Sequence, residues 1–101
     1  MQSDQTEMKV IQSQLDNAMF QAIDKCVTRF HLTKIGAAQA AIATLTGEES
    51  VRVLFDDTAI FATMPSGYVQ AGIENGMTES DIIRDALVCG TRIMFENRQS
   101  V

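Results

Sequence analysis

The side chains best suited to acid–base chemistry in this chain are carboxylates that occur in short acidic clusters. The clusters are Glu48/Glu49, Asp56/Asp57 and Glu79/Asp81/Asp85. Adjacent carboxylates on a turn or at a helix end usually face water, whereas a metal site needs ligands that converge. The one histidine, His31, has no ligand-like neighbour in the sequence. We therefore predict no catalytic residue, no metal site and no bound cofactor.

Other chemical motifs give the same indication. The sequence has no Cys-x-x-Cys pair, no His-x-x-His pair and no glycine-rich loop of the kind that holds phosphate. Cys26 and Cys89 both fall on apolar helix faces, where cysteine behaves as a small buried residue. Whether the two meet in the core is left open, and a disulfide would be unusual in a reducing compartment. We expect a protein that is not an enzyme.

Length and charge narrow the class of partner. We expect one domain over residues 1–101, with residues 1–5 and 97–101 frayed. The net charge of −5 argues against nucleic acid and against docking on anionic membranes, because both depend on Lys and Arg. The polar N-terminus carries no secretory signal, and no apolar run approaches the ~18 residues of a membrane span. A cytoplasmic location is expected.

The hydrophobic pattern predicts an α+β fold that is mainly helical. Apolar residues at helical spacing predict a long helix, Gln5–Phe30, which forms a hairpin with a second helix, Lys34–Leu45. Alternation predicts a small β-hairpin at about 51–64, with strands Val51–Phe55 and Thr58–Met64 joined by Asp56-Asp57. The same residues also fit a helical period, so an all-α fold is the alternative. Two more helices follow, a short one over Tyr68–Glu74 and a long one over Met77–Glu96.

The C-terminal helix, Met77–Glu96, has the clearest signals. Thr78 is a good N-cap, and Asp81 three residues later has the spacing of a capping box. Ala86 and Gly90 are four residues apart on the apolar side, where small side chains let another backbone approach. A mid-helix glycine costs roughly 1 kcal/mol relative to alanine. We therefore predict a close helix crossing at these two residues.

Two pairs of apolar residues lie off the main helix stripes. Val88 and Phe95 are seven residues apart in the C-terminal helix, and Phe20 and Val27 have the same spacing in the N-terminal helix. Residues seven apart stack on one side of a helix. We predict that the four form an association face, which favours a homo-oligomer, with a dimer the preferred state, and allows a protein partner.

One stretch resembles a known family. GMTESDIIRDAL, Gly76–Leu87, resembles the start of the second helix in ribbon-helix-helix DNA-binding proteins. The resemblance implies that Thr78 or Ser80 touches phosphate through the helix N-terminus, and that the strand Thr58–Met64 pairs across a dimer and enters the major groove. That strand contains no Arg, Lys, Asn or Gln to read base edges.

The leading functional hypothesis is a small, acidic, non-enzymatic protein with an adaptor or regulatory role, acting through self-association and protein–protein interaction. The ribbon-helix-helix regulator is one alternative. A small-molecule-binding module with a pocket lined by Met and Phe is the other, because six methionines accompany six aromatic residues.

Overall fold

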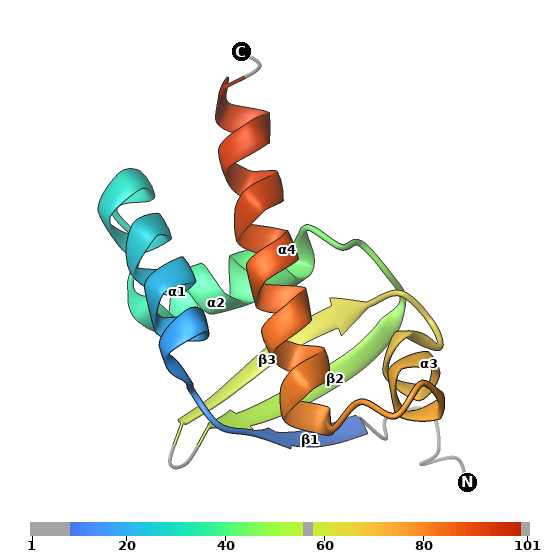
Figure 1. Cartoon of the computed structure of the whole chain (residues 1–101). Helices are drawn as coiled ribbons and strands as arrows, with labels where there is room; N and C mark the ends of the chain where they lie inside the picture. The colour runs from blue at the N-terminus through green and yellow to red at the C-terminus, as the bar shows by residue number, and fades with distance from the viewer. Residues whose placement is uncertain (1–8, 56–57, 100–101) are drawn as a thin grey trace, which may run out of the picture.

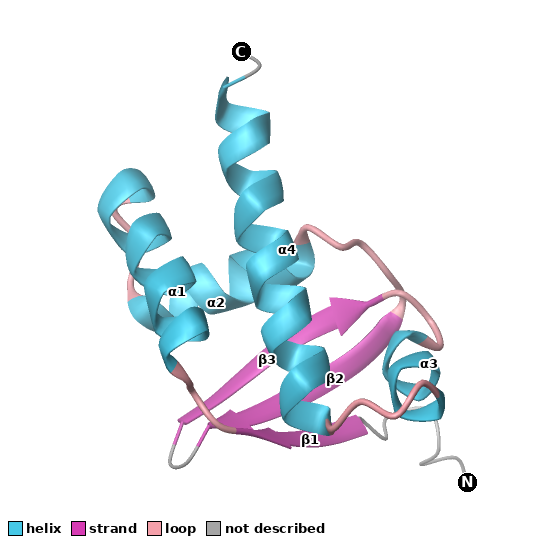
Figure 2. Cartoon of the chain, viewed as in Figure 1, coloured by secondary structure: helices cyan, strands magenta, loops and turns pink. Residues whose placement is uncertain are grey.

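The computed structural model describes residues 9–55 and 58–99 (Figure 1). Within them it has four helices and a three-stranded sheet, so the fold is α+β and mainly helical, as the sequence predicts (Figure 2). The elements in chain order are β1 (Lys9–Ser13), α1 (Asn17–Phe30), α2 (Lys34–Ala43), β2 (Glu49–Phe55), β3 (Thr58–Met64), α3 (Tyr68–Glu74) and α4 (Glu79–Gln99).

The sheet has the order β1-β2-β3. Strand β1 runs parallel to β2, and β3 runs antiparallel to it. The β-hairpin predicted at 51–64 is confirmed, and the all-α alternative is wrong. The predicted Asp56-Asp57 connection lies outside the described residues.

Alternation along the strands buries one face of the sheet and leaves the other open. Ile11, Val53 and Ile60 pair across the three strands and are all buried. The next row, Val10, Arg52 and Phe61, points the other way and is exposed, because successive side chains of a strand alternate between faces. Helices α2 and α4 pack on the buried face, as the contacts of α2 with β3 and of α4 with β1 show.

The predicted long helix over Gln5–Phe30 is wrong in its first half. Residues 9–13 form strand β1, and the helix begins only at Asn17. Asp16 has extended backbone angles and accepts a hydrogen bond from the Met19 backbone N–H at 3.0 Å, so it caps the helix at that point. Ile11 fits a helical stripe by spacing, yet pairing with β2 buries it in the sheet.

The second helix ends earlier than Leu45, because α2 stops at Ala43. After α2, the residue with left-handed backbone angles is Thr46, with φ of 47°, and not Gly47. Gly47 serves another purpose, since a Cβ there would lie 2.1 Å from the Met64 carbonyl carbon. Glycine at this position therefore permits a close approach of two backbone segments.

Helix α3 matches the predicted range residue for residue. Its Val69 is buried, whereas its Ile73 is exposed. Helix α4 continues to Gln99, beyond the predicted end at Glu96, so the predicted frayed tail is helical as far as that residue. None of the helices in the described ranges is both long and apolar enough to span a membrane.

Candidate interaction surfaces

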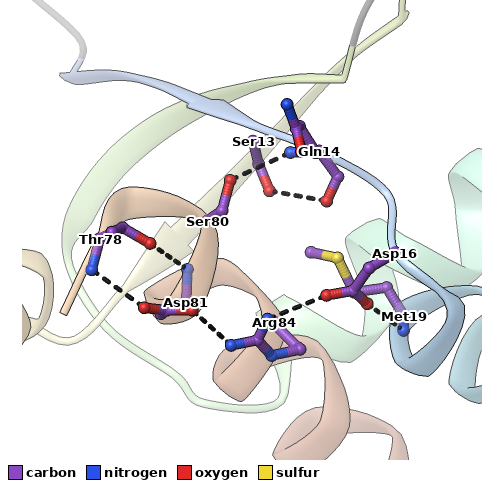
Figure 3. Close-up of polar contacts among 8 residues, drawn as sticks. All are labelled: Ser13, Gln14, Asp16, Met19, Thr78, Ser80, Asp81 and Arg84. Atoms are coloured by element: carbon purple, nitrogen blue, oxygen red, sulfur yellow. Dashed lines mark hydrogen bonds and ion pairs between the residues drawn. The ribbon is translucent and has the colours of Figure 1, made fainter.

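The first turn of α4 is a network of side chains that caps the helix and joins it to β1 and α1 (Figure 3). Asp81 N–H donates to the Thr78 hydroxyl at 3.1 Å, and Thr78 N–H donates to the Asp81 carboxylate at 3.2 Å. This reciprocal pair is the predicted capping box. Arg84 donates to Asp81 and also to Asp16 at 2.9 Å, which joins the start of α4 to the start of α1.

These bonds shift the ionisation of both carboxylates. The Met19 N–H, and then Arg84, lower the pKa of Asp16 below its ordinary value. The Thr78 N–H and hydroxyl, and then Arg84, lower the pKa of Asp81. Each shift arises because a hydrogen bond to the carboxylate favours the charged form. Both acids therefore contribute to holding the fold together.

The same turn of α4 also covers the outer edge of β1. The Gln14 backbone N–H donates to the Ser80 hydroxyl at 3.1 Å, as Figure 3 shows. The Gln12 N–H donates to the Glu79 carboxylate at 3.4 Å. An unpaired strand edge presents backbone groups that can pair with another chain. These two side chains satisfy such groups along β1.

The outer edge of β3 is covered differently. From Ala59 to Thr63, one hydrogen bond reaches this edge from the described residues, and it runs from the Phe61 N–H to the Gln39 side-chain oxygen at 3.0 Å. A groove of about 570 Å³ lies between β3 and α2. Its lining is uncharged: Gly36, Gln39, Ala40, Ala43, Ser50, Phe61, Ala62 and Thr63.

Next to this edge, the open face of the sheet carries exposed apolar side chains. Phe61 is 54% exposed and Val10 is 48% exposed. Between them lies Arg52, whose guanidinium is 5.7 Å from the centre of the Phe61 ring. A cation at this distance from a ring face is attracted to it.

The predicted association residues do not lie on one surface. Val88 and Phe95 line a groove between α1 and α4. Phe20 and Val27 lie on nearly the opposite side of α1 from its groove residues, given 100° per residue. Val27 packs against the core, and Phe20 is 38% exposed, with the Lys34 amino group 5.6 Å from its ring.

A close helix crossing lies at Gly90, between α4 and α2. A Cβ on Gly90 would be 2.0 Å from the Ala41 carbonyl oxygen, a distance that real side chains do not adopt. Ala86, one turn earlier, is fully buried. The small residues of α4 thus let the α2 backbone lie directly against it.

The other side chains that could react or ionise pack or form hydrogen bonds within the fold. Cys26 is buried, with its sulfur 4.0 Å from that of Met94, and burial raises the pKa of its thiol. Cys89 is half-buried near Asp85, so the two cysteines do not form a disulfide. Burial, and then a 2.8 Å hydrogen bond to Asp85, raise the pKa of Tyr68. Among the described residues, no three His, Cys, Asp or Glu side chains converge as metal ligands would.

The structure bears differently on the two alternative functions, the ribbon-helix-helix regulator and the small-molecule-binding module. Thr58–Met64 pairs with β2 of its own chain, and the hydroxyls of Thr78 and Ser80 accept backbone hydrogen bonds of this chain. That arrangement differs from the one that the ribbon-helix-helix resemblance implies. For the small-molecule alternative, the relevant feature is an open groove of about 380 Å³ at the end of α1 and α4. Its lining includes Phe30 and Met94.

Sequence reasoning missed the edge of β3 as a candidate surface. Thr58–Met64 lacks the charge and proline that usually protect edge strands, but this composition alone does not mark a strand as an edge. The same strand in the middle of a sheet would need no protection. Strand β3 lies at an edge because β1 pairs with the other side of β2.

In comparisons with known proteins, no protein-family model matches this chain, and no curated protein or solved structure matches it significantly.

Proposed function

We propose that this protein is non-enzymatic and acts through self-association, with the β3 strands of two copies pairing antiparallel. The observation that carries the proposal is the edge of β3: seven uncharged residues beside an uncharged groove, with one side-chain amide bonded to the edge between Ala59 and Thr63. Exposed edges of this kind are templates for strand pairing.

The register of this pairing follows from which backbone groups point outward. The Phe61 N–H points away from β2, since it reaches Gln39. Backbone groups of an antiparallel strand alternate in direction, so Ala59 and Thr63 also point outward. A two-fold axis at Phe61 would pair Phe61 with its own copy and Ala59 with Thr63. Two identical strands thus satisfy one another's outward groups, as a symmetric dimer requires.

The surroundings of β3 favour a second strand there. The helix α2 presents Gly36, Ala40 and Ala43 to the groove, and these residues occupy little space. Gln39 is a side chain that can rotate away. Because neither strand carries a charge, the net charge of −5 on each copy is not concentrated at the contact. Facing aromatic pairs across strands contribute roughly 0.2–1 kcal/mol.

Four residues of the acidic clusters accept hydrogen bonds from within the chain, which supports a non-enzymatic role. Glu49 accepts from the Gly67 N–H, and Glu79 accepts from the Gln12 N–H. Asp81 belongs to the capping box, and Asp85 accepts from the Tyr68 hydroxyl.

One proline substitution at each of the two sheet edges tests this proposal. Thr63→Pro removes an outward N–H of β3 without removing a bond to β2, and proline is tolerated at such positions. It should convert a dimer into a monomer in light-scattering mass measurements. Val10→Pro is the matched control, because it alters an outward position of the other sheet edge, β1, and should leave the mass of the dimer unchanged.

Phe61→Lys is a second variant that leaves the backbone intact and puts a charge at the centre of the contact. A wild-type protein that is monomeric throughout the micromolar range would overturn the proposal. A dimer that survives both Thr63→Pro and Phe61→Lys would also overturn it, since the contact would then lie elsewhere.

A further inference from the structure

The groove between α1 and α4 differs in character from the rest of this acidic protein. Both helices rise side by side in Figure 1, and the C-terminal half of α4 extends beyond the sheet. The groove between them has a volume of about 560 Å³. Its lining residues are Ala18, Gln21, Ala22, Lys25, Val88, Thr91, Arg92 and Phe95.

The apolar residues of this groove are spaced to receive a helix. Val88 and Phe95 stand on α4 two turns apart, which is about 10 Å along the axis. Ala18 and Ala22 face them from α1 and occupy little space. A helix laid in such a groove would present apolar side chains at positions i and i+7, the spacing typical of helix-in-groove recognition.

Phe95 is held in place before any partner arrives. Its ring centre lies 5.2 Å from that of Phe30, with the rings tilted by 50°. Tilted aromatic pairs at this separation attract one another. Phe95 is half-buried, so part of its ring remains available to a partner. A preordered anchor loses little side-chain entropy on binding.

The charge around the groove is positive. Lys25 and Arg92 line it, and no carboxylate does. The adjoining groove shares Lys25 and Phe95 and adds Arg29 and Asp24. Together the two linings contain three basic side chains and one acidic side chain, on a chain whose net charge is −5.

We propose that the groove between α1 and α4 binds an acidic amphipathic helix of another protein. Apolar side chains of that helix would fill the space beside Val88 and Phe95, and its carboxylates would face Lys25, Arg29 and Arg92. Opposite charges across an interface increase the rate of association and select among partners. This surface is separate from the β3 edge, so the inference goes beyond self-association.

A pair of synthetic peptides tests the charge preference. Both are helical peptides of about 18 residues, long enough to form a helix, with Leu at positions i, i+3 and i+7. One carries Glu on its flanks and the other carries Lys. Fluorescence anisotropy with the full-length protein at low salt should show the Glu peptide binding at least about tenfold more tightly, and added salt should reduce the difference.

Variants of the protein then locate the site. Arg92→Glu should weaken binding of the Glu peptide at least about fivefold, because it reverses an exposed charge beside the anchors. Val88→Asp should weaken binding of both peptides. Arg52→Glu, an equal charge reversal on the open face of the sheet, is the matched control and should leave the binding of both peptides unchanged. Backbone NMR shift changes should concentrate on α1 and α4.

Equal binding of the two peptides, or no binding at low salt, would overturn the inference. So would shift changes on the sheet, or an Arg92→Glu variant that binds the Glu peptide as well as the wild type does. Groove shifts that appear on concentrating the protein without peptide would identify a second copy as the occupant, and would also overturn it. None of these results bears on β3, which keeps the test of self-association separate.

Discussion

The two edges of the sheet differ in the side chains that bond to their outward backbone N–H groups. At the β1 edge, Ser80 and Glu79 of α4 accept hydrogen bonds from backbone N–H groups. At the β3 edge, between Ala59 and Thr63, a single glutamine side chain does so within the described part of the chain. Two backbone N–H groups at the β1 edge thus have partners within the chain, and we propose that the β3 edge is completed by a second copy.

The comparison explains why the start of α4 is rich in polar residues. Thr78 and Asp81 cap the helix, while Glu79 and Ser80 cover the neighbouring strand. These four residues, two of which belong to an acidic cluster of the sequence, therefore cap the helix and connect it to the edge of the sheet. After β3, the chain turns at Pro65 into α3.

The largest effect should come from Gly90→Ala, which tests what holds α4 over the β1 edge. The new methyl group would meet the Ala41 carbonyl, so α2 and α4 must separate. We expect a loss of about 3 kcal/mol in the free energy of unfolding, despite the better helix propensity of alanine. Chemical denaturation measures this loss. Arg92→Ala, at an exposed position two residues later, should be nearly neutral.

Removing the cover from β1 should have a smaller effect. The double variant Glu79→Ala/Ser80→Ala deletes both acceptors and should cost about 1–2 kcal/mol in the free energy of unfolding. The amides of Gln12 and Gln14 should exchange with solvent faster, while those of β2 keep their protection. Unchanged exchange at the two glutamines would show that these side chains do not protect the edge. Ser66→Ala, at an exposed serine, is the control.

Loss of the N-cap should cost less again. Thr78→Ala removes the hydroxyl that accepts from the Asp81 N–H, and should lower the free energy of unfolding by about 1 kcal/mol. Thermal unfolding followed by circular dichroism measures the change. Thr28→Ala, at an exposed position within α1, is the matched control and should leave the melting temperature almost unchanged.

The smallest effect concerns pH. The pKa values of Asp16 and Asp81 are lowered in the folded protein, so both carboxylates stabilise it when ionised. That stabilisation is complete above the unfolded-state pKa of about 3.9 and is lost as the pH falls through the lower folded-state values. Both side chains are partly exposed, so solvent screens the effect. Asp16→Asn keeps a capping side chain but should flatten the acid limb of a stability–pH curve.

Local signals predicted much of this fold. The range of α3, the two strands of the hairpin and the capping box of α4 depend on residues within a few positions of one another, and the structure has all of them. The N-terminal strand could not be found in this way. Its five residues pair in parallel with β2, some forty residues away, and that pairing leaves no periodic signal in the sequence.

The candidate surfaces were predictable only in part. The pattern of α4 marked Val88 and Phe95, which do line a groove. It could not relate them to Phe20 and Val27, because the rotation of α1 about its axis is set by its packing against α2 and α4. For the same reason β3 gave no sign of being an edge strand, since its place in the sheet depends on the strand that local periodicity conceals.

Amide hydrogen exchange of the two sheet edges at low and high protein concentration tests the central claim most directly. The amides of Gln12 and Gln14 should be protected to the same degree at both concentrations, because their partners are in the same chain. The amides of Ala59 and Thr63 should be unprotected when the protein is dilute and protected when it is concentrated. Exchange at these two residues that stays fast at every concentration would contradict the account.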